Sequence, residues 1–282
     1  IYTNYGVVAS PCFDTAVGAS LCGLGDSIGL AKLTKEVLGV QLQKGHARTD
    51  WTVRPIPEQL MRYAHQDVHH LLPITAKLFS QLEKSGRKEW ALELSARFAD
   101  PKMYEPNPNG IALKLAKNGK LDRRGFATLR ELIAWREARV GELDLPRRRV
   151  AEDDVLVDLA LVRPKDMTHL SAFRGLNRGE FKHSGEAILA AVKRAAQIPD
   201  AELPEVPKTE QPDPKEARAI ELIQCFVKLL SEELQISARH LMVADDVVPL
   251  LRKRFSSVDE LVSAGILSAG AGRLIGAELL EM

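Results

Sequence analysis

The chain has 282 residues, of which 45% are hydrophobic and 27% charged, and its formal net charge is +1. These values fit a folded globular protein and exclude a strongly basic or acidic chain, so any nucleic-acid-binding surface has to be a local patch. The length predicts two or three domains. Only 5% of the residues are aromatic, and the abundance of Leu, Ala, Glu, Lys and Arg favours helix over sheet.

Cysteine usage and hydropathy bear on the cellular compartment. Cys12, Cys22 and Cys225 form no CxxC pair and no even-numbered disulfide framework, which favours a reducing, cytoplasmic location. No apolar run is long enough to span a membrane, and no signal peptide opens the chain. Because the first residue is Ile1 rather than Met, we expect the sequence to be a fragment or a processed product.

The first hundred residues predict one strand and several helices. The strand lies near Cys12–Thr15, and a helix through the sequence AVGASLCG comes directly after it. Leucines at helical spacing then predict a helix that Ser27 caps and Gly39 ends. A basic, irregular loop leads to Pro57, where a further helix begins because proline is tolerated in the first turn. Another helix is expected over about residues 73–99.

Prolines divide the remainder of the chain. Residues 101–117 predict a linker, since three prolines interrupt the stretch DPKMYEPNPNG. Residues 118–197 show a nearly continuous helical pattern, and residues 198–214 carry five prolines and several acids, which is typical of a second linker. Residues 215–282 are helical again, so the two later segments are expected to form similar small helical bundles.

The stretch RYAHQDVHHLLP places two polar pairs at a spacing of four on a predicted helix. Tyr63 and Asp67 flank one side of an apolar stripe and His65 and His69 the other, so the pairs point in nearly opposite directions. Paired histidines at this spacing occur in zinc sites, but the zincin pattern needs Glu after the first His, and Gln66 stands there. The histidines therefore predict a solvated helix flank. The stripe consists of Leu60, Ala64, Val68, Leu71 and Leu72.

The surroundings of this stretch resemble a known family. The sequence from FDTAVG to HHLLPI is similar to the latter part of the exonuclease domain of ribonuclease D. The stretch DPKMYEPNPNG and residues 121–192 resemble the next part of that enzyme, including a helicase-and-ribonuclease-D C-terminal (HRDC) module. The resemblance implies a mainly α chain, in which residues 1–100 are the C-terminal remnant of an α/β ribonuclease H-like exonuclease domain. HRDC-type bundles are then expected at 118–197 and, as a second HRDC-like domain, at 215–282.

The resemblance also implies roles for Tyr63 and Asp67. Residues 63–67, YAHQD, match the family's third exonuclease motif, Tyr-x-x-x-Asp, framed upstream by Asp-Trp and Arg-Pro and downstream by Leu-Leu-Pro. The family removes nucleotides from the 3′ end of structured RNA, such as tRNA precursors, with two divalent cations, Mg²⁺ or Mn²⁺. Asp67 is then expected to bind a metal, and Tyr63 to orient the attacking water.

Two further acidic motifs of the family are not found where they belong. The Asp-x-Glu of residues 200–202 lies in the proline-rich segment, and Asp14 falls where the family has its later FDT strand rather than a metal ligand. We therefore expect the chain alone not to degrade RNA, and its first hundred residues to be loosely held. The alternative function is that of a nucleic-acid-binding HRDC protein without catalysis.

Basic residues in two regions are candidates for phosphate contacts. One group lies in the loop before the motif helix, and a solvated loop is the alternative there: Lys44, Arg48 and Arg54. The other group lies in a helix–hairpin–helix-like element of the HRDC segment: Arg174, Arg178 and Lys182. The run Arg147–Arg149 fits a solvated turn equally well.

RNA is the expected partner, without a membrane, and a monomer is favoured. Residues 120–197 are expected to fold alone and to bind RNA weakly, without reading bases, and less strongly as salt rises. Trp51, Trp90 and Trp135 are assigned to packing contacts.

Overall fold

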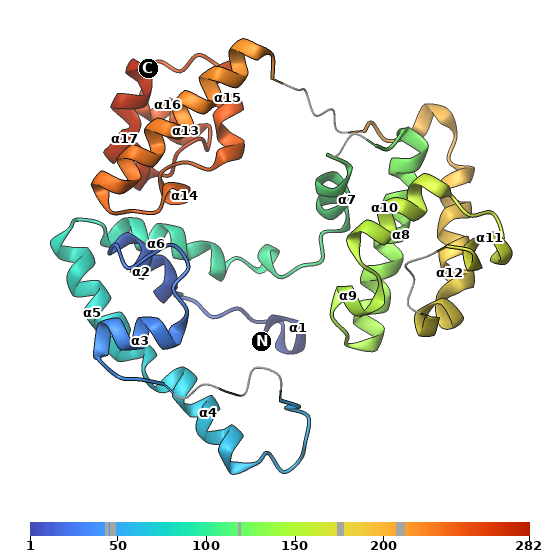
Figure 1. The fold of residues 1–282 in the computed structure, drawn as a ribbon, viewed down its shortest axis with the longest axis horizontal. Coiled ribbons are helices and arrows are strands. Elements are labelled where there is room, and N and C mark those ends of the chain that lie inside the picture. The colour runs from blue at the N-terminus through green and yellow to red at the C-terminus, as the bar shows by residue number, and fades with distance from the viewer. Residues whose placement is uncertain (43–44, 46–48, 118–119, 174–177, 207–211) are drawn as a thin grey trace. The chain divides into compact units, whose positions relative to one another are not determined.

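The computed structural model describes residues 1–282 except 43–44, 46–48, 118–119, 174–177 and 207–211. The side chains of residues 178–182 are also outside the described part. Within the described part, all regular secondary structure is helical and no residue lies in a strand (Figure 1). The chain forms two compact units. The first unit combines Ile1–Tyr104 with Pro212–Met282, and the second is Glu105–Gln211.

Helix α2 (Thr15–Leu21) corresponds to the helix predicted through AVGASLCG, but the residues just before it, where the sequence predicts a strand, are not in a strand. The Asp14 carboxylate accepts a 2.7 Å hydrogen bond from the backbone N–H of Ala16 and so caps the helix. The predicted strand near Cys12–Thr15 is therefore wrong, because a capping acid starts a helix there. The extended residues before it pair with no other strand in the part of the chain that the structure describes.

The next helices begin and end close to the predicted residues. Helix α3 (Leu30–Leu38) ends where Gly39 adopts the left-handed conformation with φ 72°, although Gly29 rather than Ser27 precedes its first residue. Gly86, with φ 69°, divides the single helix predicted over residues 73–99. The helices of this stretch are α1 (Tyr2–Tyr5), α4 (Glu58–His69), α5 (Leu71–Lys84) and α6 (Lys88–Ala96), followed by the 3₁₀ turns η1 (Arg97–Ala99) and η2 (Pro101–Met103).

The C-terminal part of the first unit is a bundle of helices. Helix α13 (Pro214–Leu234) opens with a capping box in which the Asp213 side chain bonds the backbone of Glu216 and the Glu216 side chain bonds back. It continues through α14 (Ala238–Leu241), the 3₁₀ turn η4 (Ala244–Asp246), α15 (Val247–Arg252), α16 (Val258–Ser263) and α17 (Ala269–Glu281).

One hydrophobic core joins the two parts of the first unit. Val17, Leu21 and Trp90 from the N-terminal helices pack in the same cluster as Ile223 and Ile275 from the C-terminal bundle. The structure therefore gives α2 and α6 a core that the expectation of loosely held first hundred residues did not include. The C-terminal helices cover α2 and α6, so these helices do not depend on a sheet for burial.

Directed polar contacts reinforce this core at the start of α17. The indole Nε1 of Trp90 donates a 2.8 Å hydrogen bond to Oγ of Ser268. The Glu93 carboxylate accepts hydrogen bonds from the backbone N–H of Ala269 at 3.0 Å and of Gly270 at 3.3 Å. A carboxylate at a helix N-terminus satisfies free N–H groups and complements the helix dipole. The contact between α6 and α17 is thus both apolar and polar.

The second unit is organised around α8 (Arg123–Leu143), the helix that carries Trp135. Trp135 is buried there with Leu129 and Leu132, which agrees with its assignment to packing. The helices packed around α8 include α7 (Pro108–Ala116), α9 (Arg147–Val150), α10 (Asp153–Val162) and α12 (Arg178–Gln197); α11 (Met167–Ser171) and the turn η3 (Asp200–Glu202) complete the described elements.

Helix α7 lies inside the segment predicted as a linker, residues 101–117. The Asn107 side chain caps the helix through the backbone N–H of Gly110, and Pro108 occupies its first turn. Ala112 and Ala116 are fully buried against the core of the second unit. The prolines therefore begin a helix here instead of marking an unstructured connection.

The helices α13 to α17 repeat the order of α8 to α12. Each series starts with a helix of 21 residues and continues with one of 4 residues. In each series the fourth helix is short and the last one is longer. This repetition supports the expectation of two similar bundles. None of the helices in the described part combines the length and the apolar character needed to cross a membrane.

Candidate functional site

Tyr63 and Asp67 lie one turn apart on α4, and both are half-buried. The ring of Trp51, from the preceding loop, packs beside Tyr63 with ring centroids 6.0 Å apart and an interplanar angle of 50°. Trp51 is 37% exposed, so it is only partly buried by its packing contacts. The structure therefore places the phenol and the carboxylate on one face of α4, with an aromatic neighbour beside the phenol.

The histidines of the same helix contact each other. The rings of His65 and His69 stack with centroids 4.9 Å apart, and His70 meets His69 edge-on at 5.0 Å. His65 and His69 are exposed, as expected for a solvated helix flank. Across the described residues, no three His, Cys, Asp or Glu side chains come close enough to hold a metal ion together.

The carboxylates described here do not fit a site for two cations. Asp67 belongs to no ligand cluster among the described side chains, and Asp14 is engaged as the cap of α2. Hard divalent cations need several oxygen ligands, and two cations held close together need more. Asp67 by itself can supply one such ligand.

The apolar stripe predicted beside Tyr63 is only partly covered. Leu60 is the buried residue of α4, whereas Val68 is 61% exposed and Leu72, just beyond the helix, is 81% exposed. Among the helices described, α4 packs chiefly against α5. Leu72 belongs to α5 rather than α4, so the predicted stripe spans two helices, and helical spacing did not predict that Val68 and Leu72 would be exposed.

The predicted phosphate-binding residues divide into those whose side chains the structure describes and those whose side chains it does not. Lys44, Arg48 and Arg174 lie outside the described residues, as do the side chains of Arg178 and Lys182 on α12. The Arg54 guanidinium donates hydrogen bonds to the backbone carbonyls of Trp51 at 2.9 Å and Val53 at 3.0 Å, so it is held against its own loop.

The basic run Arg147–Arg149 is partly neutralised. Arg147 makes a bidentate pair with the Glu137 carboxylate, with N–O distances of 2.8 and 2.6 Å. This hydrogen bonding raises the pKa of Arg147. The same carboxylate contacts the buried Arg136, which also bonds Asp153 at 2.6 Å. These contacts make Arg147 part of an internal charge network.

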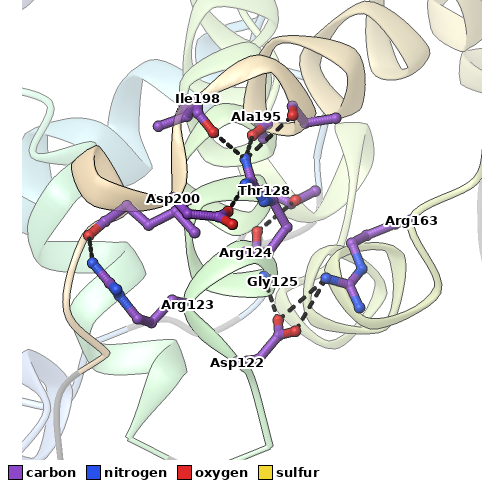
Figure 2. A network of polar contacts seen from close by, with 11 residues as sticks. Asp122, Arg123, Arg124, Gly125, Thr128, Arg163, Ala195, Ile198 and Asp200 are labelled. Carbon is purple, nitrogen blue, oxygen red and sulfur yellow. Dashed lines mark hydrogen bonds and ion pairs between the residues drawn. The ribbon is translucent and has the colours of Figure 1, made fainter.

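A second polar network surrounds the start of α8 (Figure 2). Asp122 caps the helix through the backbone N–H of Gly125 at 2.6 Å, and it pairs with Arg163 at 3.2 Å. The Gly125 hydrogen bond, with the Arg163 charge, holds the pKa of Asp122 below its usual range. Arg124 donates to the carbonyls of Ala195 and Ile198 and pairs with Asp200, as Figure 2 shows.

The sequence does not predict the structural role of Arg124, which donates hydrogen bonds to free carbonyl groups at the C-terminal end of α12. A cation is favourable there because the helix dipole places negative charge at that end. The only signal in the sequence is an Arg pair next to a capping Asp, which does not reveal a partner 71 residues away.

Comparison with known proteins defines the class of this chain. Residues 1–83 match the 3′-5′ exonuclease family model, and residues 126–192 match the HRDC domain model. The molecule therefore combines exonuclease sequence with an HRDC domain. The site residues Tyr63 and Asp67 lie within the exonuclease match.

The particular family is defined by the similar proteins. Ribonuclease D of Bartonella henselae is 34% identical over 249 residues, which cover 88% of this chain and 61% of that protein. Ribonuclease D of Nitrobacter hamburgensis is 30% identical and is matched over 100% of this chain and 72% of its own length. The crystal structure of Escherichia coli RNase D, described as an exoribonuclease involved in structured RNA processing, aligns with a TM-score of 0.78 at 30% identity, covering 99% of this chain and 74% of that one.

The chain belongs to the ribonuclease D family, whose members are 3′-5′ exoribonucleases. It spans about three fifths of the length of several curated relatives, for example 61% and 62% of those from Bartonella henselae and Acidiphilium cryptum. Exonucleases of this class typically use divalent metal ions.

Proposed function

We propose that Tyr63 and Asp67 contribute to the active site of a ribonuclease D-type 3′-5′ exoribonuclease. The observation that carries the proposal is their placement on one face of α4, within the segment that matches the exonuclease model. Both side chains are half-buried, and Tyr63 lies beside Trp51, which leaves the phenol and the carboxylate within reach of a ligand. The stacked histidines on the other flank take no part.

The two side chains have different chemical roles in this proposal. Asp67 supplies a carboxylate, the ligand type that Mg²⁺ and Mn²⁺ prefer. Tyr63 supplies a hydroxyl that can both donate and accept a hydrogen bond, which suits it to orienting a water molecule. Since the described carboxylates do not assemble a two-cation site, the remaining ligands have to come from other residues before hydrolysis occurs.

The substrate we propose is structured RNA with a free 3′ end, such as a tRNA precursor. The similarity to the E. coli enzyme, whose description names structured RNA processing, supports this class. The HRDC segment is proposed to hold the RNA through its phosphates, because such contacts are tolerant of sequence.

A hybrid protein tests the site. The chain is joined to an exonuclease segment that supplies the Asp-x-Glu motif and the second acidic motif, and it is incubated with 3′-labelled RNA and Mg²⁺ or Mn²⁺. Asp67→Asn should nearly abolish stepwise shortening, since Asn lacks the charge that holds a cation. The matched double variant His65→Ala/His69→Ala, on the opposite flank of the same helix, should retain most of the activity.

The reverse outcome would overturn the assignment: activity lost in the histidine variant and retained in Asp67→Asn. The chain without the added segment should bind RNA but not shorten it. Shortening by the chain alone that a chelator stops, and that Asp67→Asn removes, would show that its own acids complete a site.

The second candidate function is nucleic-acid binding without catalysis. The position of Asp67, which has no neighbouring ligands among the described side chains, favours it. The same hybrid distinguishes the two functions. A correctly folded hybrid that binds RNA but never shortens it, with either metal, supports the binding function and contradicts the exonuclease proposal.

A further inference from the structure

The second unit contains a pocket of about 780 Å³ that the site described above does not use. Four cations line it, Arg124, Arg163, Lys165 and Lys193, and no Asp or Glu of the described residues does. Its apolar wall includes Val162, Pro164, Leu189 and Ala190. Pockets of several hundred Å³ with apolar walls and a few polar groups are typical of small-ligand sites.

The two arginines at this pocket are held by hydrogen bonds and ion pairs to the surrounding backbone and carboxylates (Figure 2). Arg124 is committed to the C-terminal carbonyls of α12 and to Asp200, and Arg163 is paired with Asp122. These contacts join α8 to the end of α12 and to the residue directly after α10. The charges of both arginines are largely balanced, so they shape the pocket more than they attract a ligand.

The two lysines are placed differently. Lys165 and Lys193 are exposed, and no hydrogen bond or ion pair connects either ammonium group to another described residue. Lysine ammonium groups are strong donors to phosphate oxygens. Val162, at the edge of the same pocket, is 45% exposed, so apolar surface lies open beside the two charges.

We propose that this pocket binds one unpaired nucleotide of an RNA strand. The base lies against the apolar wall, and the phosphates on either side of it contact Lys165 and Lys193. The charge complementarity favours an anion, and the apolar wall favours an anion that carries a flat, weakly polar body. This assignment rests on the proposed function insofar as RNA is the partner. It adds Lys165 and Lys193 to the phosphate-contact residues that the sequence predicts.

The test measures binding, not cleavage. The full chain is titrated, in a chelator, into a fluorescent RNA hairpin that carries a single-stranded 3′ tail, and anisotropy is recorded at several salt concentrations. Lys193→Glu should weaken binding by about tenfold, whereas Lys114→Glu should weaken it far less, since exposed Lys114 lies on α7 away from the pocket lining. Replacing Lys165 and Lys193 together by Gln should lower the salt slope by about 1.4, at about 0.7 for each lost phosphate contact.

A substitution without charge change tests the apolar wall. Ala190 is exposed and lines the pocket, so Ala190→Phe should fill it and weaken binding several-fold. Ala138→Phe, at an exposed position of α8 outside the lining, is the matched control and should leave binding unchanged. Neither site is buried, so both variants should fold.

Four outcomes would overturn the proposal. Equal losses of RNA affinity in Lys193→Glu and Lys114→Glu would show that the effect is general electrostatic attraction. Unchanged RNA binding in Ala190→Phe would show that no base occupies the pocket. A blunt hairpin that binds as tightly as the tailed one, with the same losses, would exclude an unpaired nucleotide. If an acidic peptide required Lys193 for binding and RNA did not, the pocket would be assigned to a protein partner.

This test and the test of the proposed function fail separately. An inactive hybrid enzyme bears on Tyr63 and Asp67 and leaves a binding result obtained in chelator standing. A chain that binds no RNA in chelator overturns the pocket assignment, whatever the hybrid does.

Discussion

Helices α4 and α6 belong to the same N-terminal segment, but they are packed very differently. In α4 the buried residue is Leu60, and Val68 is 61% exposed. In α6 Trp90 is 1% exposed and Ala91 is fully buried, because the C-terminal bundle covers them. The helix with the motif residues is therefore a minor contributor to the core, and α6, which contributes more, has no motif. Substitutions of buried residues in α6 should therefore lower the free energy of unfolding, whereas substitutions at Tyr63 and Asp67 of α4 should chiefly affect the proposed catalysis.

The largest effect on stability is expected from Trp90→Ala. Removing a fully buried tryptophan costs about 3–5 kcal/mol, and here it also removes the partner of Ser268. Hydrogen exchange of α6 and α17 in increasing denaturant measures the free energy of unfolding of the first unit. Trp51→Ala, which changes a residue that is 37% exposed, is the control and should cost less than about 1 kcal/mol. Similar losses for both would contradict the packing difference.

The close approach of α17 to Trp90 predicts the next effect. A Cβ on Gly270 would lie 1.9 Å from Cγ of Trp90, so Gly270→Ala should destabilise the first unit by about 1–3 kcal/mol. Gly141→Ala is the control, because nothing lies within 4 Å of its Cβ position in α8. There the substitution should stabilise the helix by about 0.5–1 kcal/mol. Destabilisation at Gly141, or none at Gly270, would show that the two environments are misassigned.

The uncovered face near α4 predicts a small effect. Leu72 is 81% exposed and Leu78, on the same helix α5, is fully buried. Leu72→Ala should change the free energy of unfolding by less than about 0.5 kcal/mol. Leu78→Ala should lower it by about 2–5 kcal/mol. If denaturant titrations gave Leu72→Ala a comparable cost, a covering contact on this face would have to exist.

The smallest effect concerns pH. Burial, with the Arg239 charge next in size and a smaller contribution from Arg97, lowers the pKa of His240 below its ordinary value of 6.5, while Asp26 and Asp14 oppose the shift. The unfolded chain then binds a proton that the folded unit does not. Stability from this group is full above pH 6.5 and is lost as the pH falls below it. Denaturant midpoints between pH 7.5 and 5.5 should therefore fall more in the original chain than in His240→Gln, and parallel curves would contradict this.

Much of the fold could be predicted because local sequence determines where helices begin and end. Gly39 ends α3 and Pro57 directly precedes α4, as their backbone preferences require. The prediction for Cys12–Thr15 was wrong because Asp14 acts through its side chain as a helix cap, which outweighs the strand preference of its neighbours. From residue types alone, a residue that caps a helix cannot be distinguished from one that begins a strand.

Contacts between distant parts of the sequence could not be predicted in the same way. The fit of Trp90 against Gly270 depends on two helices that are separated by the whole second unit in the sequence. For the site, the spacing of Tyr63 and Asp67 was sufficient to place both on one face of α4. The exposure of Val68 was not predictable, since periodicity shows that a face is apolar but not whether anything covers it.

The contacts of Arg124 show that the folded HRDC region extends beyond residue 197, where the sequence predicts its end. Its bonds to Ala195 and Ile198 hold the chain beyond α12, and Arg123 donates in turn to the carbonyl of Leu203, which is itself buried. The proline-rich segment thus starts as part of the folded unit. A gene fragment that stops at Gln197 would remove this anchored stretch, so a fragment for expression or transplantation into another protein should keep the whole compact unit, Glu105–Gln211.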